Sequence, residues 1–307
     1  MSKILIFIIS IIIFFLLGLL TEHYNPFPYS SVKFHIKNIL TKSNFKIDDY
    51  GYSVCDFESI SVKNFHLKHN KDQTLIVGHI YTADKNDNYI NTFEDFISIE
   101  NIQFKNTLLL GDIFLEPSVS KWNLLIYDIR KISQNMYLVP GNHDVGDKEN
   151  TKRDIFFQLF DTLPMYVKKN NYDLIMLDST IGNSFLNETQ INFILNKMKK
   201  NNNKKNLFIA THHLLRPGSK KISNQPIVNH KGLMQIINKE IKNLKIKYKN
   251  IFFLAGDLGN NKNFDCIEKD NIHFISVGLS GNKNDIVLVY DNISNKFFKV
   301  SLSGNKE

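Results

Sequence analysis

The chain has 307 residues, of which 43% are hydrophobic and 22% are charged. This composition excludes a largely disordered protein, and the length allows one large domain with a substantial core. The net charge is +8, from 38 basic and 30 acidic residues, which favours anionic partners such as phosphate esters or acidic lipid headgroups. No stripe of Lys or Arg interleaved with aromatic residues occurs in the sequence, so we do not expect a nucleic acid as a partner.

The first segment of the chain is apolar. Residues 4–20 contain no charge and are rich in Ile, Leu and Phe. This length is short for a membrane-spanning helix and long for the core of a signal peptide. Because no small-x-small cleavage site follows, we expect residues 1–22 to form an uncleaved single-pass anchor; a cleaved signal that leaves a soluble domain is the alternative. An N-terminal anchor before one long domain usually exports that domain, so we expect an extracytoplasmic location.

Residues 23–72 have turn residues near their start and no long periodic pattern, so we expect a linker and an edge segment. Cys55 and Cys266 are the two cysteines of the chain and form no Cys-x-x-Cys motif. They allow at most one disulfide, which would suit a location outside the cytoplasm. Two buried thiols are the alternative.

Residues 73–302 alternate between short apolar runs and amphipathic stretches. The apolar runs have the length of strands: Thr74–Val77, Thr107–Leu110, Met136–Val139, Leu174–Leu177, Leu207–Ala210, Ile251–Ala255, Phe274–Val277, Ile286–Tyr290 and Phe297–Val300. Helical spacing of apolar residues occurs over Trp122–Ile129, after the capping residues Asn187 and Gln190, and over Leu233–Leu244. This order predicts one layered α/β domain, with antiparallel pairing among the last strands.

Five of these strands are followed directly by small and polar residues. The turns are Gly78-His79-Ile80-Tyr81, Gly111-Asp112-Ile113, Pro140-Gly141-Asn142-His143-Asp144, Thr211-His212-His213 and Gly256-Asp257-Leu258-Gly259. Ligands of layered α/β sheets bind beyond the carboxyl ends of strands, and glycine lets the backbone turn sharply there. Carboxylate, amide and imidazole groups together suit a divalent metal. One such turn is ordinary, but five of them predict a metal site.

The turn at residues 140–144 also carries groups for proton transfer. His143 can exchange a proton near neutral pH, and Asp144 can fix its tautomer and raise its basicity. A metal at this place could hold phosphate oxygens and lower the pKa of a water, while a histidine protonates the departing oxygen.

The order Gly-Asp, Gly-Asn-His-Asp and His-His, each behind an apolar strand, resembles the calcineurin-like metallophosphoesterases over roughly residues 74–301. The resemblance implies a four-layer αββα sandwich and a two-metal phosphoesterase site. Asp112 would bridge the two metals, and Asn142 and His212 would bind the second one. His143 would act as the leaving-group acid or transition-state donor, oriented by Asp144.

The chain departs from the family's first and last motifs. The family has Asp-x-His where this chain has His79-Ile80-Tyr81, and Gly-His-x-His where it has Gly256-Asp257-Leu258-Gly259. The second metal therefore keeps Asp112, Asn142, His212 and Asp257. The first keeps His79 and Asp112 unless Tyr81, Asp84 or water fills in, and Tyr81 is a poor ligand unless ionised. We expect one or two ions of Mn, Fe, Zn or Mg.

The functional expectation is a membrane-anchored, metal-dependent phosphoesterase. It would hydrolyse a phosphomonoester, phosphodiester or pyrophosphate with metal-activated water, and its substrate would be a phosphorylated small molecule, lipid or glycan. The alternative is a catalytically impaired protein of the same fold that binds a phosphorylated ligand or a protein partner.

Overall fold

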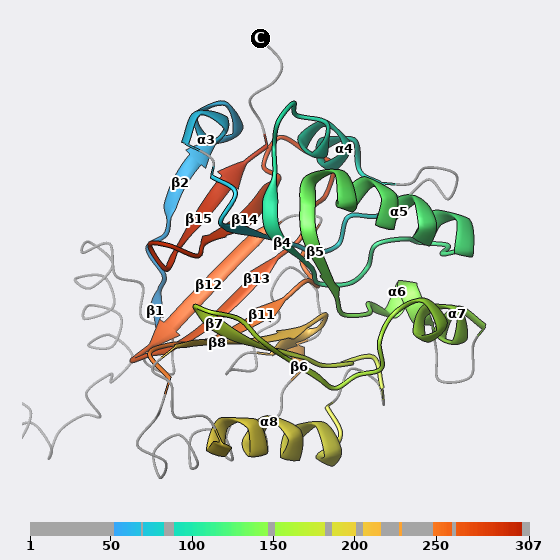
Figure 1. Cartoon of the computed structure of the whole chain (residues 1–307), viewed down its shortest axis with the longest axis vertical. Helices are drawn as coiled ribbons and strands as arrows, with labels where there is room; N and C mark the ends of the chain where they lie inside the picture. The colour runs from blue at the N-terminus through green and yellow to red at the C-terminus, as the bar shows by residue number, and fades with distance from the viewer. Residues whose placement is uncertain are drawn as a thin grey trace, which may run out of the picture. The chain divides into compact units, whose positions relative to one another are not determined.

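The computed structural model describes residues 52–68, 70–82, 89–146, 151–181, 186–200, 205–215, 227–228, 248–259 and 262–302 (Figure 1). The predicted anchor at residues 1–22 and the predicted helix at Leu233–Leu244 lie outside these residues. Within them, no helix combines the length and the apolar character needed to cross a membrane.

Two mixed β-sheets form the centre of the fold. The seven-stranded sheet has the order β1 (Ser53–Val54), β12 (Phe264–Lys269), β13 (Ile272–Val277), β11 (Ile251–Ala255), β8 (Asn206–Thr211), β7 (Tyr172–Met176), β6 (Met165–Lys168). The six-stranded sheet has the order β2 (Glu58–Ser61), β15 (Lys296–Ser301), β14 (Ile286–Asp291), β3 (Gln73–Val77), β4 (Phe104–Leu109), β5 (Ser133–Leu138). A two-stranded sheet pairs β9 (Leu214–Leu215) with β10 (Ile227–Val228).

Strand direction places the functional turns. β7, β8, β11 and β13 are parallel neighbours, and so are β3, β4 and β5. Parallel strands end at one edge of a sheet, so each sheet gathers its strand-end turns along a single edge. The late hairpins β12–β13 and β14–β15 are antiparallel, which confirms the prediction for the end of the chain.

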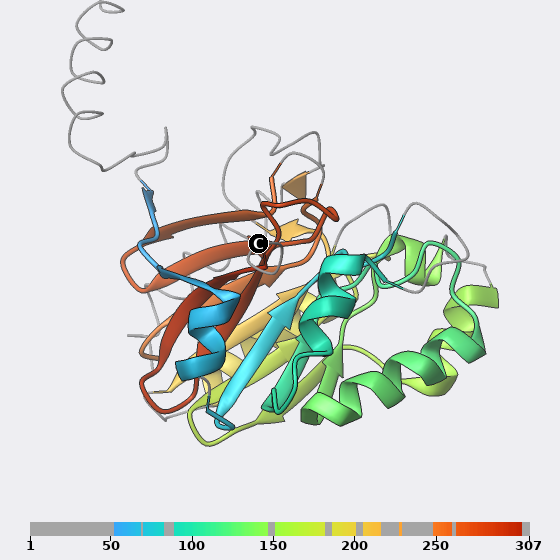
Figure 2. The same cartoon turned by 90° about the horizontal axis from the view of Figure 1, so that it is seen from above.

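Three apolar clusters separate the layers. Between the sheets, Leu108 and Leu288 pack with Phe208 and Leu254. Outside the six-stranded sheet, α4 (Asn91–Ile97), α5 (Val119–Ile132) and α7 (Thr151–Leu159) bury Phe93, Trp122 and Phe156 (Figures 1 and 2). Outside the seven-stranded sheet, α8 (Glu188–Lys200) packs through Ile194 and Met198 (Figure 1). The described elements are therefore layered as helix, sheet, sheet and helix.

All nine predicted strands are present, and two predicted helices are α5 and α8. The side chain of Asn187 caps α8 by accepting a hydrogen bond from the Gln190 backbone at 3.0 Å. The side chain of Gln190, however, does not complete a capping box. It bonds to the backbone N–H and carbonyl oxygen of Asp178 at 2.8 and 2.9 Å, which ties α8 to the end of β7.

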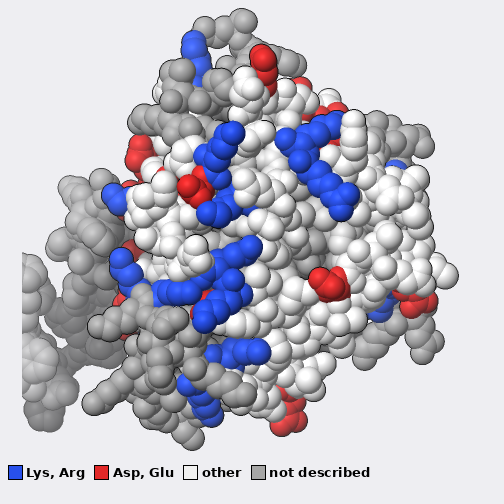
Figure 3. Space-filling view, in the orientation of Figure 1, with Lys and Arg blue, Asp and Glu red and all other residues white. Residues whose placement is uncertain are grey.

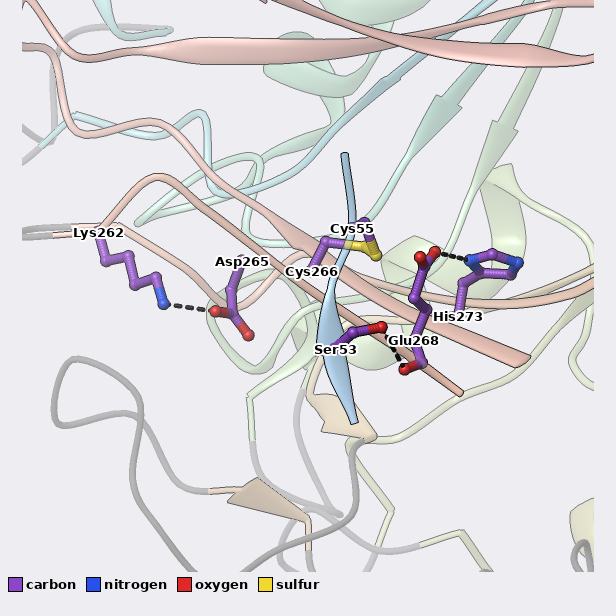
Figure 4. Close-up of a disulfide and its surroundings, with 7 residues drawn as sticks. All are labelled: Ser53, Cys55, Lys262, Asp265, Cys266, Glu268 and His273. Atoms are coloured by element: carbon purple, nitrogen blue, oxygen red, sulfur yellow. Dashed lines mark hydrogen bonds and ion pairs between the residues drawn. A yellow bond between two sulfur atoms is a disulfide. The ribbon is translucent and has the colours of Figure 1, made fainter. Parts of the chain in front are cut away.

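The predicted linker and edge segment supplies an edge strand to each sheet, β1 and β2, and then α3 (Val62–Lys68). Cys55 follows β1 and forms a disulfide with Cys266 of β12, with 5.4 Å between the Cα atoms (Figure 4). The Ser53 hydroxyl donates to the Glu268 carbonyl oxygen at 3.3 Å, beside the disulfide (Figure 4). Of the two sequence-based alternatives for the cysteines, the structure has the disulfide.

Replacing both cysteines, Cys55→Ala with Cys266→Ala, should lower the free energy of unfolding by about 2–5 kcal/mol, because the disulfide closes a loop of 211 residues in the unfolded chain. Denaturant unfolding of the variant and the parent chain measures this. The parent chain with a reducing agent should match the variant. Equal stability of the oxidised parent and the variant would show that the bridge does not form.

Candidate metal centre

The five strand-end turns identified in the sequence meet at one place. The turns after β3, β4 and β5 come from the six-stranded sheet, and those after β8 and β11 come from the seven-stranded sheet. The His79 N–H donates to the Gly111 carbonyl oxygen at 2.9 Å, and the Gly256 N–H donates to the His212 carbonyl oxygen at 2.9 Å. The predicted convergence of these turns is therefore what the structure shows.

Glycines make this close approach possible. A Cβ atom at Gly141 would lie 2.1 Å from Asp112 Oδ1, and one at Gly78 would lie 2.5 Å from the Cα of Gly256. Neither separation is compatible with non-bonded atoms. The glycines of the motifs are thus required because neighbouring turns pack backbone against backbone.

Three predicted metal ligands surround the Nε2 atom of a fourth, His212. It lies 3.2 Å from Asn142 Oδ1, 3.4 Å from Asp112 Oδ1 and 3.8 Å from Asp257 Oδ1. Asp112, His212 and Asp257 are buried, whereas Asn142 is exposed. The cluster is therefore closed on the protein side and open to solvent on the Asn142 side.

The hydrogen bond of the other ring nitrogen fixes the direction of His212. Nδ1 donates to the Leu110 carbonyl oxygen at 2.9 Å, so Nε2 is the atom that faces the three oxygens. A lone pair directed at three acceptor oxygens is unfavourable unless a proton or a metal ion lies between them. Burial alone would lower the pKa of His212, but the carboxylates of Asp112 and Asp257 outweigh it and raise this pKa to about 10.

The carboxylates respond to the same contacts. Burial disfavours the charge on Asp112, yet His212, His79 and His143 together hold its pKa below the usual range. Burial raises the pKa of Asp257, with His212 opposing the shift. Without a metal ion, the His212 proton supplies the positive charge between these carboxylates.

The donor set fits a divalent ion. It combines one imidazole nitrogen, two carboxylates and one amide oxygen, a mixture that binds Mn, Fe, Zn or Mg. Ligand atoms that share an ion at roughly 2.0–2.2 Å lie roughly 3–4 Å apart, which is the spacing around His212 Nε2. The backbone bond of Nδ1 is also the usual support of a metal-binding histidine.

The residues that depart from the family motifs form a row of rings beside this cluster. The Tyr81 ring lies between His79 and His143, with centroid distances of 4.6 and 4.8 Å. His79 Nδ1 donates to the Leu279 carbonyl oxygen at 3.1 Å, and a Cβ at Gly259 would lie 2.9 Å from the His79 ring. His79 and Asp112 both adopt positive φ, 51° and 55°, a strained conformation common at functional sites.

Tyr81 is a neutral phenol at physiological pH. Burial, followed by the negative charges of Asp112, Asp257 and Asp144, raises the pKa of Tyr81 to about 12. An un-ionised phenol is a poor metal ligand. The four side chains predicted for the second metal therefore lie together, whereas those left for the first, His79 and Asp112, lie beside a neutral ring.

Asp144 does not orient His143 as expected. Its Oδ1 accepts the N–H groups of Ile113 and Phe114 at 2.9 and 3.1 Å, and its Oδ2 accepts the Gly141 N–H at 2.9 Å. Burial, followed by the charge of Asp112, raises the pKa of Asp144 to about 7. Asp144 thus joins the turns after β4 and β5, and it positions His143 through the backbone.

Several neighbouring side chains support the centre. His213 Nδ1 lies 3.0 Å from Ser179 Oγ, and burial and the His212 charge lower the pKa of His213 to about 3. Arg153 of α7 bonds to Asp178 Oδ2 at 2.7 Å and to Thr180 Oγ1 at 2.5 Å. Arg153 could not be identified from the sequence, because it stands in a helix and not in a strand-end turn. Ser179 stands two residues after the predicted Leu174–Leu177 strand, but its contact with His213 depends on the fold. Asp84 lies outside the described residues.

A second grouping of possible ligands, Cys55, Glu268 and His273, is not a metal site in this structure. Cys55 is bonded to Cys266, so its thiolate is not available to a metal (Figure 4).

A family model described as calcineurin-like phosphoesterase matches residues 79–229. Among solved structures, Vps29 from Chaetomium thermophilum has a TM-score of 0.33 and 14% identity, covering 71% of this chain and 79% of that chain. Vps29 from Entamoeba histolytica in complex with Zn²⁺ has a TM-score of 0.33 and 10% identity, covering 75% of this chain and 99% of that chain. No curated protein matches the sequence.

The two adjacent histidines should differ in metal binding. His212→Ala removes the nitrogen at the centre of the cluster and should weaken Mn²⁺ or Zn²⁺ binding by more than about 100-fold, beyond the 10–100-fold loss typical of an outer-shell partner. His213→Ala is the comparison: a ligand atom of His213 lies within 4.8 Å of those of His212 and Asp257, but its Nδ1 bonds to Ser179, so this variant should lose at most about 10-fold. Calorimetric titration measures both affinities. An equal loss in the two variants would contradict the assignment of His212.

Proposed function

Because residues 79–229 of the chain belong to the calcineurin-like phosphoesterase family, we propose that the protein is a metal-dependent phosphoesterase acting on a phosphomonoester, phosphodiester or pyrophosphate. The observation that carries the proposal is the arrangement around His212 Nε2, which faces three oxygen ligands while Nδ1 is held by the Leu110 carbonyl. No other described contact of this ring satisfies Nε2.

Asp112, Asn142, His212 and Asp257 would hold a divalent ion such as Mn, Fe, Zn or Mg, with His79 and Asp112 as the remaining ligands for a second one. The ion would supply Lewis acidity toward a phosphate oxygen and toward water. His143 is half-buried at the open side, where its imidazole can transfer a proton to the departing oxygen. Asp144 holds the turn that carries His143, and the His143 N–H donates to Asp112 Oδ1 at 3.0 Å.

We extend the proposal to the setting of the domain. The layer order supports the four-layer αββα sandwich of the metallophosphoesterase type for residues 73–302. The Cys55–Cys266 disulfide supports a domain outside the cytoplasm, since disulfides persist in oxidising compartments. Residues 1–22 would then be the single-pass anchor, and the substrate a phosphorylated small molecule, lipid or glycan.

A second candidate is a non-catalytic protein of the same fold that binds a phosphorylated ligand or a protein partner. The observation that favours it is the altered first ligand set. A neutral Tyr81 ring lies next to His79, and Gly259 offers no side chain as a ligand. A protein of this kind would bind phosphate esters without hydrolysing them.

Asp112→Ala should abolish turnover of generic phosphate esters in the presence of Mn²⁺, with a loss of at least about 100-fold in kcat/KM, because it removes a carboxylate that faces His212. Asp128→Ala is the matched control: Asp128 lies on α5, pairs with Lys131, and should leave turnover unchanged.

The full-length chain, purified in detergent, is suitable for this assay. Binding of phosphate esters without Mn²⁺-dependent turnover in the parent chain would instead support the non-catalytic candidate.

Tyr81→Phe should reduce kcat by about 10-fold or more and leave the affinity for Mn²⁺ unchanged. Among the described residues, the Tyr81 hydroxyl has no hydrogen-bond partner, so it can donate to a substrate oxygen beside His143. Steady-state kinetics and metal titration measure the two effects. A large loss of Mn²⁺ affinity in this variant would mean that the phenol is itself a ligand.

A further inference from the structure

The end of the domain opposite the metal centre is rich in lysine. Here the parallel strands begin, and the turns 70–72, 168–171 and 291–296 of the two sheets meet. Lys205 Nζ donates to the Lys169 carbonyl oxygen at 2.7 Å, the Lys249 N–H donates to the Lys205 carbonyl oxygen at 2.8 Å, and Asn171 bonds to Asn292. We name this surface the basic end. Its lysines are Lys71, Lys105, Lys168, Lys169, Lys205, Lys249, Lys269 and Lys296.

Few acidic groups neutralise the basic end. Asp72 pairs with Lys105 at 2.6 Å, Glu268 lies 2.9 Å from the His273 ring, and Asp270 follows Lys269 in the turn between β12 and β13. Asp291 is 9% exposed and accepts bonds from Asn70 and from two backbone N–H groups of its own turn. Lys and Arg side chains predominate over Asp and Glu on the face shown in Figure 3. The basic end therefore presents net positive charge.

An apolar side chain projects from the middle of these lysines. Ile293, at the tip of the β14–β15 turn, is 68% exposed, more than the other exposed large hydrophobic residues of the described chain. The turn is held in shape, because Asp291 Oδ1 accepts the N–H groups of Ile293 and Ser294, both at 2.8 Å. A fixed apolar tip surrounded by lysines is the pattern of a surface that meets anionic lipid headgroups.

The chain also enters the domain beside this surface. Ser53 pairs with Glu268 at the end of β12, and the Lys269 ammonium group lies 5.4 Å from the centre of the Tyr52 ring. The sequence before Tyr52 includes the uncharged apolar stretch at residues 4–20.

We propose that the basic end docks on an anionic membrane surface, with Ile293 at the headgroup level. The strands between the two ends have five or six residues, so the metal centre would lie roughly 15–20 Å or more from the docked surface. The inference rests on the proposed anchor and phosphoesterase site, and it narrows the substrate: the phosphate group would be in the aqueous phase, on a soluble molecule or a glycan, and not in the headgroup layer under the domain.

Tryptophan quenching by brominated lipids tests the docking. Ile293→Trp is compared with Asn284→Trp, an exposed position in the turn between β13 and β14 at the metal end. The parent chain gives the baseline, because its one tryptophan, Trp122, is fully buried. The full chain is reconstituted in vesicles of phosphatidylcholine alone or mixed with phosphatidylserine, both with brominated acyl chains.

Docking predicts that the fluorescence added by Ile293→Trp is quenched at least about twofold in the anionic vesicles. This quenching should be lost at high salt and absent in the neutral vesicles. The fluorescence added by Asn284→Trp should not be quenched. In the Ile293→Trp background, Lys168→Glu with Lys296→Glu should abolish the quenching, whereas Lys283→Glu at the metal end should not. The quenching measurement needs no enzymatic turnover, so its result does not depend on the result of the phosphoesterase assay.

Two results would overturn the proposal. Equal quenching in the Ile293→Trp and Asn284→Trp variants, or none in either, would mean that the basic end does not face the bilayer. The second result is a salt-sensitive change in the fluorescence of the Ile293→Trp variant on adding duplex DNA, with no change on adding vesicles. It would assign the basic end to a nucleic acid instead.

Discussion

The candidate metal centre depends on the hydrogen bond from His212 Nδ1 to the Leu110 carbonyl oxygen. Leu110 follows β4 of the six-stranded sheet and His212 follows β8 of the seven-stranded sheet, so this bond joins the two sheets at their carboxyl edges. It also commits Nε2 to the oxygens of Asp112, Asn142 and Asp257. A single bond therefore sets both the approach of the sheets and the orientation of the central ligand.

Asp144 performs a similar task within one sheet. Its carboxylate accepts N–H groups from the turn after β4 and from the turn after β5, which holds both turns at a fixed separation. Only glycine fits at position 141, because a Cβ there would lie 2.1 Å from Asp112 Oδ1. The Gly-Asn-His-Asp sequence therefore has a structural role as well as a chemical one. Its glycine allows the turns after β4 and β5 to touch, and its aspartate holds them together.

Apolar runs predicted the strands well where a strand is buried on both faces. β3, β8 and β11 are buried at every position, and the polar residues of their sequences stand only at the strand ends, so each contains an uninterrupted apolar run. β6, an edge strand, and β12, which pairs with only the two residues of β1 on one side, were not predicted, because their half-buried positions mix polar and apolar residues. The candidate ligands could be identified from the sequence because each stands close to the end of a strand. The role of Asp144, the Gln190 bonds to Asp178 and the pairing of Cys55 with Cys266 depend on distances between segments far apart in sequence, which no local pattern encodes.

Two residues that depart from the family motifs, His79 and Gly259, lie next to each other. The His79 ring occupies the space next to Gly259, and any side chain at position 259 would place its Cβ 2.9 Å from that ring. The histidine in the first motif and the glycine in the last motif are therefore compatible with each other, and a larger residue at position 259 would require His79 to move. The Tyr81 ring then lies next to the His79 and His143 rings and is tilted against both. Loss of ligands without compensation would leave a gap here; the chain instead has packed rings on this side, next to the Asp112, Asn142, His212 and Asp257 side chains. The proposed binding of a single ion by those four side chains would require this arrangement.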